Sequence, residues 1–74
     1  MVEQIDAVTA ARRAKIELAK FDERIKNIEV DKVELGDKGW VVDLSYTAEK
    51  QAAKKRILIH PVSAKVLAIS NQNA

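Results

Sequence analysis

The chain has 74 residues and no cysteine, and its 13 Lys and Arg against 11 Asp and Glu give a formal net charge of +2. This length accommodates one domain, and without cysteine neither disulfides nor thiolate metal ligands can support its core. A charged fraction of 32% beside a hydrophobic fraction of 47% excludes general disorder, and the small net charge is not typical of a nucleic-acid-binding protein.

The beginning of the chain shows no export signal. Glu3, Asp6 and Arg12 lie where a signal peptide has its apolar stretch. The apolar runs elsewhere extend over only a few residues, which is too short to cross a bilayer. We therefore expect a cytoplasmic protein without membrane contact, folded as a single domain over residues 1–74.

The first predicted element is an amphipathic helix over about residues 6–26. Asp6 is suited to the N-cap position, and no glycine or proline interrupts the segment through Lys26. On a helical wheel an arc of about 100° collects the apolar side chains, which we expect to face the core. These residues are Ala7, Ala10, Ala11, Ala14, Leu18, Phe21, Ile25 and Ile28.

After Asn27 the apolar residues alternate instead, which predicts a strand over about residues 28–35. The step from Val30 to Val33 breaks this alternation by one residue. Either a bulge at this step or a strand that starts only near Asp31 would place Val33 on the core face. The following GDKG, residues 36–39, is typical of a hairpin turn because its glycines tolerate positive φ.

Three more strands are predicted, over about residues 40–47, 56–60 and 66–70. The first has the clearest alternation, with Trp40, Val42, Leu44 and Tyr46 on its core face. The segment AEKQAAKK, residues 48–55, contains good helix formers and no glycine or proline, so we expect either a long mobile loop or one helical turn at a hairpin tip. The last strand is short and suits a sheet edge.

Together these elements predict an α+β fold. One N-terminal amphipathic helix packs on a three- or four-stranded antiparallel sheet, with the small core between the two layers. Trp40 and Tyr46 are expected to belong to this core rather than to a binding surface.

Three stretches in this order resemble the PepSY-like family of small domains, which have a cystatin-like helix-on-sheet arrangement. They are IDAV at residues 5–8, GWVVDL at residues 39–44, and residues 57–67. The resemblance implies a non-catalytic role in the inhibition or regulation of peptidases. The family has a glycine where this chain has Ala64, so we expect the turn before the last strand to be built differently.

A shorter resemblance connects AARRA, residues 10–14, and GWVV, residues 39–42, with the accessory protein O family of gas vesicles. It implies a role in the assembly of a larger particle with a defined protein partner.

No residue set amounts to a catalytic centre. His60 is the only histidine, and a zinc site needs three or four ligands, so a structural role is expected for it. The sequence also lacks a Gly-x-Ser-x-Gly motif and the glycine spacings of nucleotide-binding loops. We expect neither enzymatic activity, nor a cofactor, nor a bound metal.

The strongest binding candidates lie at the edge of the last strand and on the outer face of the sheet. An uncharged antiparallel edge can accept a further strand from a peptide or from a second copy of the chain. The sequence therefore predicts a module that binds a protein or peptide, with a homodimer as one form of this association. The candidate residues are Val41, Leu58, Val66, Ala68 and Ser70.

Nucleic-acid binding is the alternative hypothesis, and it depends on two basic clusters. Phosphate binding would need both clusters on one surface, with exposed aromatic rings for base stacking. The three aromatic residues instead fall on predicted core faces. The basic candidates are Arg12, Arg13 and Lys15 on the helix, and Lys50, Lys54, Lys55 and Arg56 near the hairpin.

Overall fold

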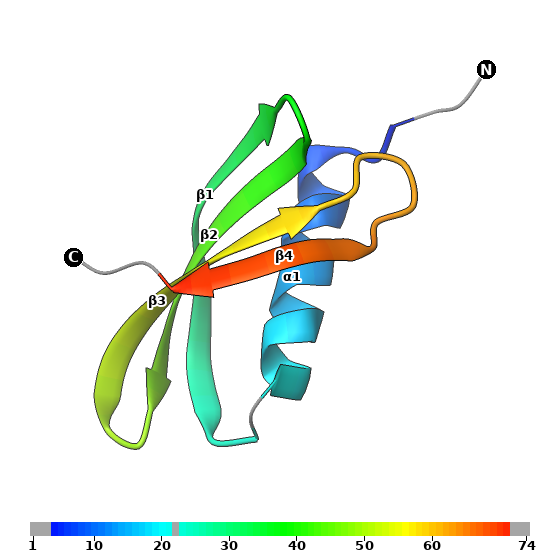
Figure 1. The fold of residues 1–74 in the computed structure, drawn as a ribbon. Helices are drawn as coiled ribbons and strands as arrows, with labels where there is room; N and C mark the ends of the chain where they lie inside the picture. Colours follow the sequence, from blue (N-terminus) through cyan, green and yellow to red (C-terminus); the bar gives the residue numbers. More distant parts are fainter. Residues whose placement is uncertain (1–3, 22, 72–74) are drawn as a thin grey trace.

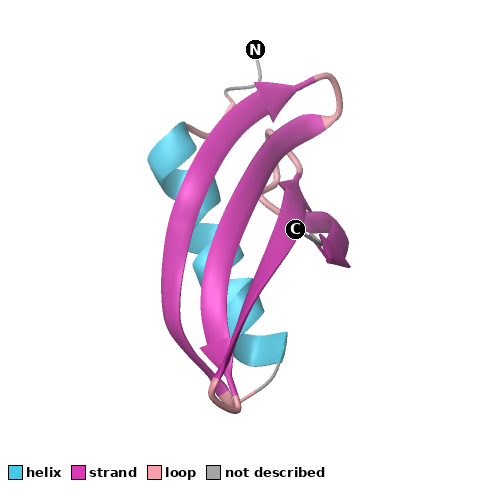
Figure 2. Cartoon of the chain, turned by 90° about the vertical axis from the view of Figure 1, so that its left-hand side faces the viewer, coloured by secondary structure: helices cyan, strands magenta, loops and turns pink. Residues whose placement is uncertain are grey.

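The computed structural model describes residues 4–21 and 23–71. Helix α1 (Ala7–Phe21) is followed by β1 (Ile25–Gly36), β2 (Gly39–Ala48), β3 (Gln51–Ile59) and β4 (Val66–Asn71). The strands form one antiparallel sheet in the order β1-β2-β3-β4, and α1 covers one of its faces (Figures 1 and 2). The predicted α+β arrangement is confirmed, with four strands.

The start of α1 follows the prediction. Asp6 is the N-cap: its side-chain Oδ1 accepts the Thr9 N–H at 2.8 Å, and its carbonyl oxygen accepts the Ala10 N–H at 3.0 Å. Hydrogen bonds from the Thr9 side chain and backbone hold the pKa of the Asp6 carboxyl below its ordinary value. The stability from this cap is therefore present above that ordinary value and is lost as the pH falls through the folded-state pKa.

The helix ends at Phe21, well before the predicted residue 26. Ile25 and Ile28 fit the helical period, but both belong to β1, where Ile25 pairs with Ala48. Asn27 has a φ of 55°, which an α-helix does not allow. Phe21 is correspondingly 60% exposed, so the prediction that it lies in the core is wrong.

Of the two alternatives at the step from Val30 to Val33, the structure contains the bulge, because β1 already starts at Ile25. The β1–β2 register shifts between Val30 and Lys32, so that Val33 faces Val42 across the strands. A second shift, between Lys26 and Glu29, accompanies the positive φ of Asn27. Both bulges keep the apolar side chains of a long, curved strand toward α1.

The segment AEKQAAKK is neither a loop nor a helical turn, which corrects the prediction. Ala48 pairs with Gln51, and the β2–β3 ladder continues without a register shift to Trp40 and Ile59. The tip therefore consists of Glu49 and Lys50 alone, with φ of 51° and 66°, as a two-residue turn with both central residues left-handed requires. Strand pairing outweighs the local helix propensity here.

The core lies between α1 and the inner face of β2 and β3. Ala10 and Ala14 let the helix approach the sheet closely, and Trp40 and Tyr46 are half-buried around the centre. The Trp40 indole N–H donates to the Ile5 carbonyl at 3.0 Å, which ties the segment before α1 to β2. The fully buried apolar residues are Ala10, Ala14, Leu18, Val42, Leu44, Ile57 and Ile59.

The turn between β3 and β4 is organised by His60. Its Nδ1 accepts the backbone N–H groups of Val62 and Ser63, each at 3.1 Å. The backbone N–H of His60 donates to the Lys65 carbonyl at 2.8 Å, and the His60 carbonyl accepts the Ala64 N–H at 3.1 Å. Ala64 has a φ of 62°, in the left-handed region that favours glycine. The alanine thus takes a backbone conformation that glycine adopts more readily.

Replacing Ala64 by glycine is expected to stabilise the protein by about 0.5–1 kcal/mol, because glycine adopts positive φ without the Cβ penalty. Urea unfolding followed by Trp40 fluorescence would measure the change. Ala68→Gly is the matched control: in the extended β4 the same substitution should destabilise by a similar amount. A loss of stability in Ala64→Gly would contradict the strain assigned to this turn.

Candidate functional site

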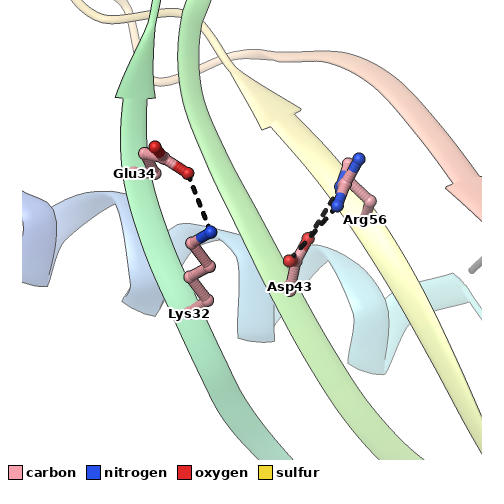
Figure 3. Close-up of polar contacts among 4 residues, drawn as sticks. All are labelled: Lys32, Glu34, Asp43 and Arg56. Atoms are coloured by element: carbon pink, nitrogen blue, oxygen red, sulfur yellow. Dashed lines mark hydrogen bonds and ion pairs between the residues drawn. The ribbon is translucent and has the colours of Figure 1, made fainter.

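The strand order leaves β1 and β4 as the two edges of the sheet, and the two edges differ in chemistry. β1 is interrupted by two bulges, and exposed charged side chains follow one another along it. Lys32 Nζ and Glu34 Oε2 form an ion pair on it at 3.1 Å (Figure 3). Bulges and charges of this kind protect an edge from further pairing. The charged residues of β1 are Lys26, Glu29, Asp31, Lys32 and Glu34.

β4, with the sequence VLAISN, carries no ionisable side chain. Its one register irregularity lies at its start, where Leu67 is the extra residue between the Ile59–Val66 and Leu58–Ala68 pairs. Leu67 is 48% exposed. In the part of the chain that the structure describes, no strand pairs with the outer edge of β4. This edge is therefore the one open to further pairing.

The register divides the predicted partner-binding residues between the two faces of β4. Val66 and Ile69 lie opposite the buried Ile59 and Ile57, so they belong to the helix side and are half-buried. Ala68 and Ser70 are exposed on the outer side, opposite Leu58 and Arg56 respectively. Both sides of β4 thus present small or apolar side chains next to its free backbone.

On the outer face, Val41, Leu58 and Ala68 form one row across β2, β3 and β4, since Val41 pairs with Leu58 and Leu58 with Ala68. Val41 and Leu58 are half-buried within the row, whereas Ala68 is exposed at its end. The structure therefore brings these three predicted residues together, with the apolar row ending at the β4 edge.

Beside this row the outer face carries polar side chains that contact one another, four of which are drawn in Figure 3. Arg56 Nε donates to Asp43 Oδ1 at 2.9 Å, and Nη2 lies 3.5 Å from Oδ2. This hydrogen bond, with the carboxylate charge, raises the pKa of the Arg56 guanidinium. The Ser45 hydroxyl donates to the Asp31 carboxylate on β1. These cross-strand contacts connect the strands to one another.

The basic residues near the β2–β3 hairpin do not form one cluster. Alternation along β3 places Lys54 and Arg56 on the exposed outer face and Lys55 on the helix side, where it is 8% exposed. Arg12 and Lys15 are exposed on α1, on the other side of the sheet, and Arg13 pairs with Glu17 at 3.0 Å. The basic residues of α1 thus lie in the helix layer, whereas Lys54 and Arg56 lie on the outer face of the sheet and Lys50 at the hairpin tip.

A feature that sequence reasoning missed lies at the far end of β4. Lys55 Nζ lies 4.8 Å from the ring centroid of Phe21 and donates to Asn71 Oδ1 at 2.5 Å. Lys55 is in phase with Ile57 and Ile59, so alternation along β3 was the signal for its inward position. A strand that starts only at residue 56, as the sequence predicts, leaves Lys55 outside this alternation, whereas β3 starts at Gln51.

A shallow groove lies at the end of the molecule formed by the α1–β1 connection and the β2–β3 tip. Its walls mix cations and carboxylates, and Arg24 and Glu49 form an ion pair across it. Two of its walls contain left-handed residues, Asn27 and the Glu49–Lys50 pair. The lining residues are Glu23, Arg24, Lys26, Asn27, Thr47, Glu49 and Lys50.

His60 uses its Nδ1 lone pair for the two turn N–H groups, which leaves the ring hydrogen on Nε2. Among residues 4–21 and 23–71 no three His, Asp or Glu side chains come together as metal ligands would. The contacts of His60 are those of a turn-stabilising residue.

Replacing His60 by leucine is expected to destabilise the protein by about 1 kcal/mol, because the Val62 and Ser63 N–H groups lose their acceptor. His60→Asn should lose less than half as much, since the asparagine Oδ1 can occupy the position of Nδ1. If urea unfolding showed the same loss of unfolding free energy for both variants, the hydrogen-bond acceptor at residue 60 would not be what stabilises the turn.

Comparison of the chain with protein-family models, with curated proteins and with solved structures finds no match. Across the residues that the structure describes, no helix has both the length and the apolar character needed to cross a membrane.

Proposed function

We propose that the protein is a small non-catalytic module that binds a protein or peptide by accepting a strand at β4. The observation that carries this proposal is the contrast between the two edges: β1 is charged and bulged, whereas β4 has no ionisable side chain. In strand addition the backbone N–H and C=O groups of the edge provide affinity, and side chains on alternate positions provide specificity.

The surroundings of β4 support this mode of binding. Leu67 and Val62, which flank the start of the edge, are both exposed apolar side chains. On the outer side the row of Val41, Leu58 and Ala68 continues to the edge, and on the helix side Val66 and Ile69 are only half-buried. A partner strand with apolar residues on both faces would bury part of each set.

The resemblance to PepSY-like domains adds a regulatory role to the proposal. A module without a catalytic centre changes the activity of another protein through binding, and an edge strand is a means of capturing an extended segment of that protein. A second copy of this chain is the other occupant that the same edge would accept, giving a homodimer with a sheet continuous through two β4 strands.

A heptapeptide display library selected on the protein would test the proposal. We expect the enriched peptides to alternate apolar residues and, when titrated into ¹⁵N-labelled protein, to shift the amide signals of β4 more than those of β1. The variant Leu67→Lys places a charge at the edge on a residue that is already exposed, and it should weaken the selected peptides at least about tenfold with the fold retained.

The matched control is Leu35→Lys, which adds a lysine at another exposed leucine, near the end of β1. It should leave peptide affinity unchanged. Peptides that shift β1, or that bind both variants like the unchanged protein, would contradict the proposal. Retention of DNA or RNA at low salt and its loss at high salt would favour the nucleic-acid alternative instead.

A further inference from the structure

On the helix side of the sheet, next to β4, one lysine of β3 is largely buried. Lys55 is 8% exposed, although its neighbours in sequence, Lys54 and Arg56, are both exposed. An ammonium group has three N–H donors, and its burial is unfavourable unless they are paired. Among the described residues, the contacts of Lys55 Nζ are one hydrogen bond, to Asn71 Oδ1, and the face of the Phe21 ring. Both partners are uncharged.

The position of this cation connects it to the open edge. Asn71 pairs with Lys55 in the β3–β4 ladder and is the last residue of β4. A strand added outside β4 would place one of its residues opposite Asn71, with the side chain on the same face. That residue would lie two strand spacings, roughly 10 Å, from the Lys55 backbone, a span that the extended lysine and a glutamate side chain cover together.

Phe21 completes the surroundings of this position. Phe21 is 60% exposed at the end of α1, and the Lys55 ammonium lies over its ring. An incoming side chain would therefore meet an aromatic surface, an ammonium group and an amide. A carboxylate on an aliphatic stem complements all three, because the stem packs on the ring while the oxygens accept hydrogen bonds from the ammonium.

We propose that the strand accepted by β4 carries a carboxylate opposite Asn71, where it pairs with Lys55, and an apolar residue two positions away, opposite Ile69. This inference rests on the proposed function and specifies its partner: an extended acidic peptide segment. Ile69 lies two residues before Asn71, on the same face of β4, and is half-buried. The residue of the added strand that faces Ile69 should therefore be apolar.

Three acetylated and amidated heptapeptides would test the inference: TVTETVT, TVTQTVT and TVTKTVT. Each sequence is a palindrome, so parallel and antiparallel addition both place valine two positions from the central residue. Titrated into ¹⁵N-labelled protein at low ionic strength, the glutamate peptide should bind about tenfold tighter than the glutamine peptide, and the lysine peptide should bind weakest. The Lys55 ammonium and Asn71 side-chain amide signals should shift with the glutamate peptide.

Lys55→Met keeps the length and the buried stem of the side chain but removes the charge, and it should abolish the preference for glutamate over glutamine. Lys55→Gln is a second neutral variant, for use if the methionine variant does not fold. Lys54→Met removes the adjacent lysine from the exposed outer face and should retain the full preference.

The possible results separate the two proposals. Equal binding of the glutamate and glutamine peptides, with β4 signals shifted, would overturn the carboxylate inference and leave strand addition intact. If none of the peptides shifts β4, both proposals are wrong. Shifts of β4 that depend on protein concentration without peptide would identify a second copy as the occupant and overturn the acidic peptide.

Discussion

Replacement of Gly39 by alanine is expected to destabilise the protein by at least about 3 kcal/mol. A Cβ atom at this position would lie 2.3 Å from the Ile59 carbonyl oxygen and 3.1 Å from Pro61 Cδ. The first of these contacts is with backbone, so no side-chain rotation can relieve it. In addition, Gly39 has a φ of 145°, which residues with a Cβ rarely adopt.

Gly36→Ala is the matched control at the other end of the same turn. A Cβ there would meet its nearest neighbour, the Gly39 carbonyl oxygen, at 3.7 Å, which is an ordinary contact. Its free energy of unfolding should therefore change by less than about 1 kcal/mol. Urea unfolding of both variants, followed by Trp40 fluorescence, would compare them, and similar losses would mean that the close approach to β3 is not the cause.

This close approach also bears on the candidate binding edge. Gly39 lies against the end of β3, at Ile59, and against Pro61 in the turn that leads to β4. Displacement of this backbone would move the turn held by His60, and with it the start of β4. Gly39 is thus required for the position of the edge as well as for the β1–β2 turn that the sequence pattern predicts.

The sequence predicts those features that depend on residues close together in the chain, and it misses those that depend on tertiary contacts. Asp6 as N-cap, the bulge after Val30 and the strand from Trp40 onward are each determined by short-range chemistry, and the structure contains all three. The second half of the β2–β3 hairpin was not predictable in this way. Residues 51–55 have helical propensity, and they form a strand because β2 offers an unpaired partner edge.

The extent of β3 also determines how the residues near the candidate site are arranged. The uncharged edge of β4 could be anticipated from composition alone, and β4 is an edge strand in the structure. The inward position of Lys55 could not, because Lys54, Lys55 and Arg56 look like one basic cluster until they are known to alternate along a strand. Contact between Phe21 and Lys55 further depends on where α1 ends relative to β3, which is a tertiary property.

Two leucines allow the core and the binding edge to be separated by experiment. Leu18 is fully buried between α1 and the sheet, whereas Leu67 is 48% exposed on β4. Leu18→Ala should destabilise the protein by about 2–5 kcal/mol, because the small core cannot collapse around the cavity. Leu67→Ala should change the free energy of unfolding by less than about 0.5 kcal/mol. Thermal and urea unfolding would measure both.

Peptide binding should respond to Leu67 although stability does not. Truncation of this exposed side chain removes apolar surface that an added strand would bury, so Leu67→Ala should weaken peptides selected on the unchanged protein several-fold. If Leu67→Ala instead destabilises the protein as much as Leu18→Ala, then Leu67 belongs to the folded core and β4 is not an open edge. If Leu67→Ala lowers peptide affinity but leaves the free energy of unfolding unchanged, Leu67 contacts the partner strand and does not stabilise the fold.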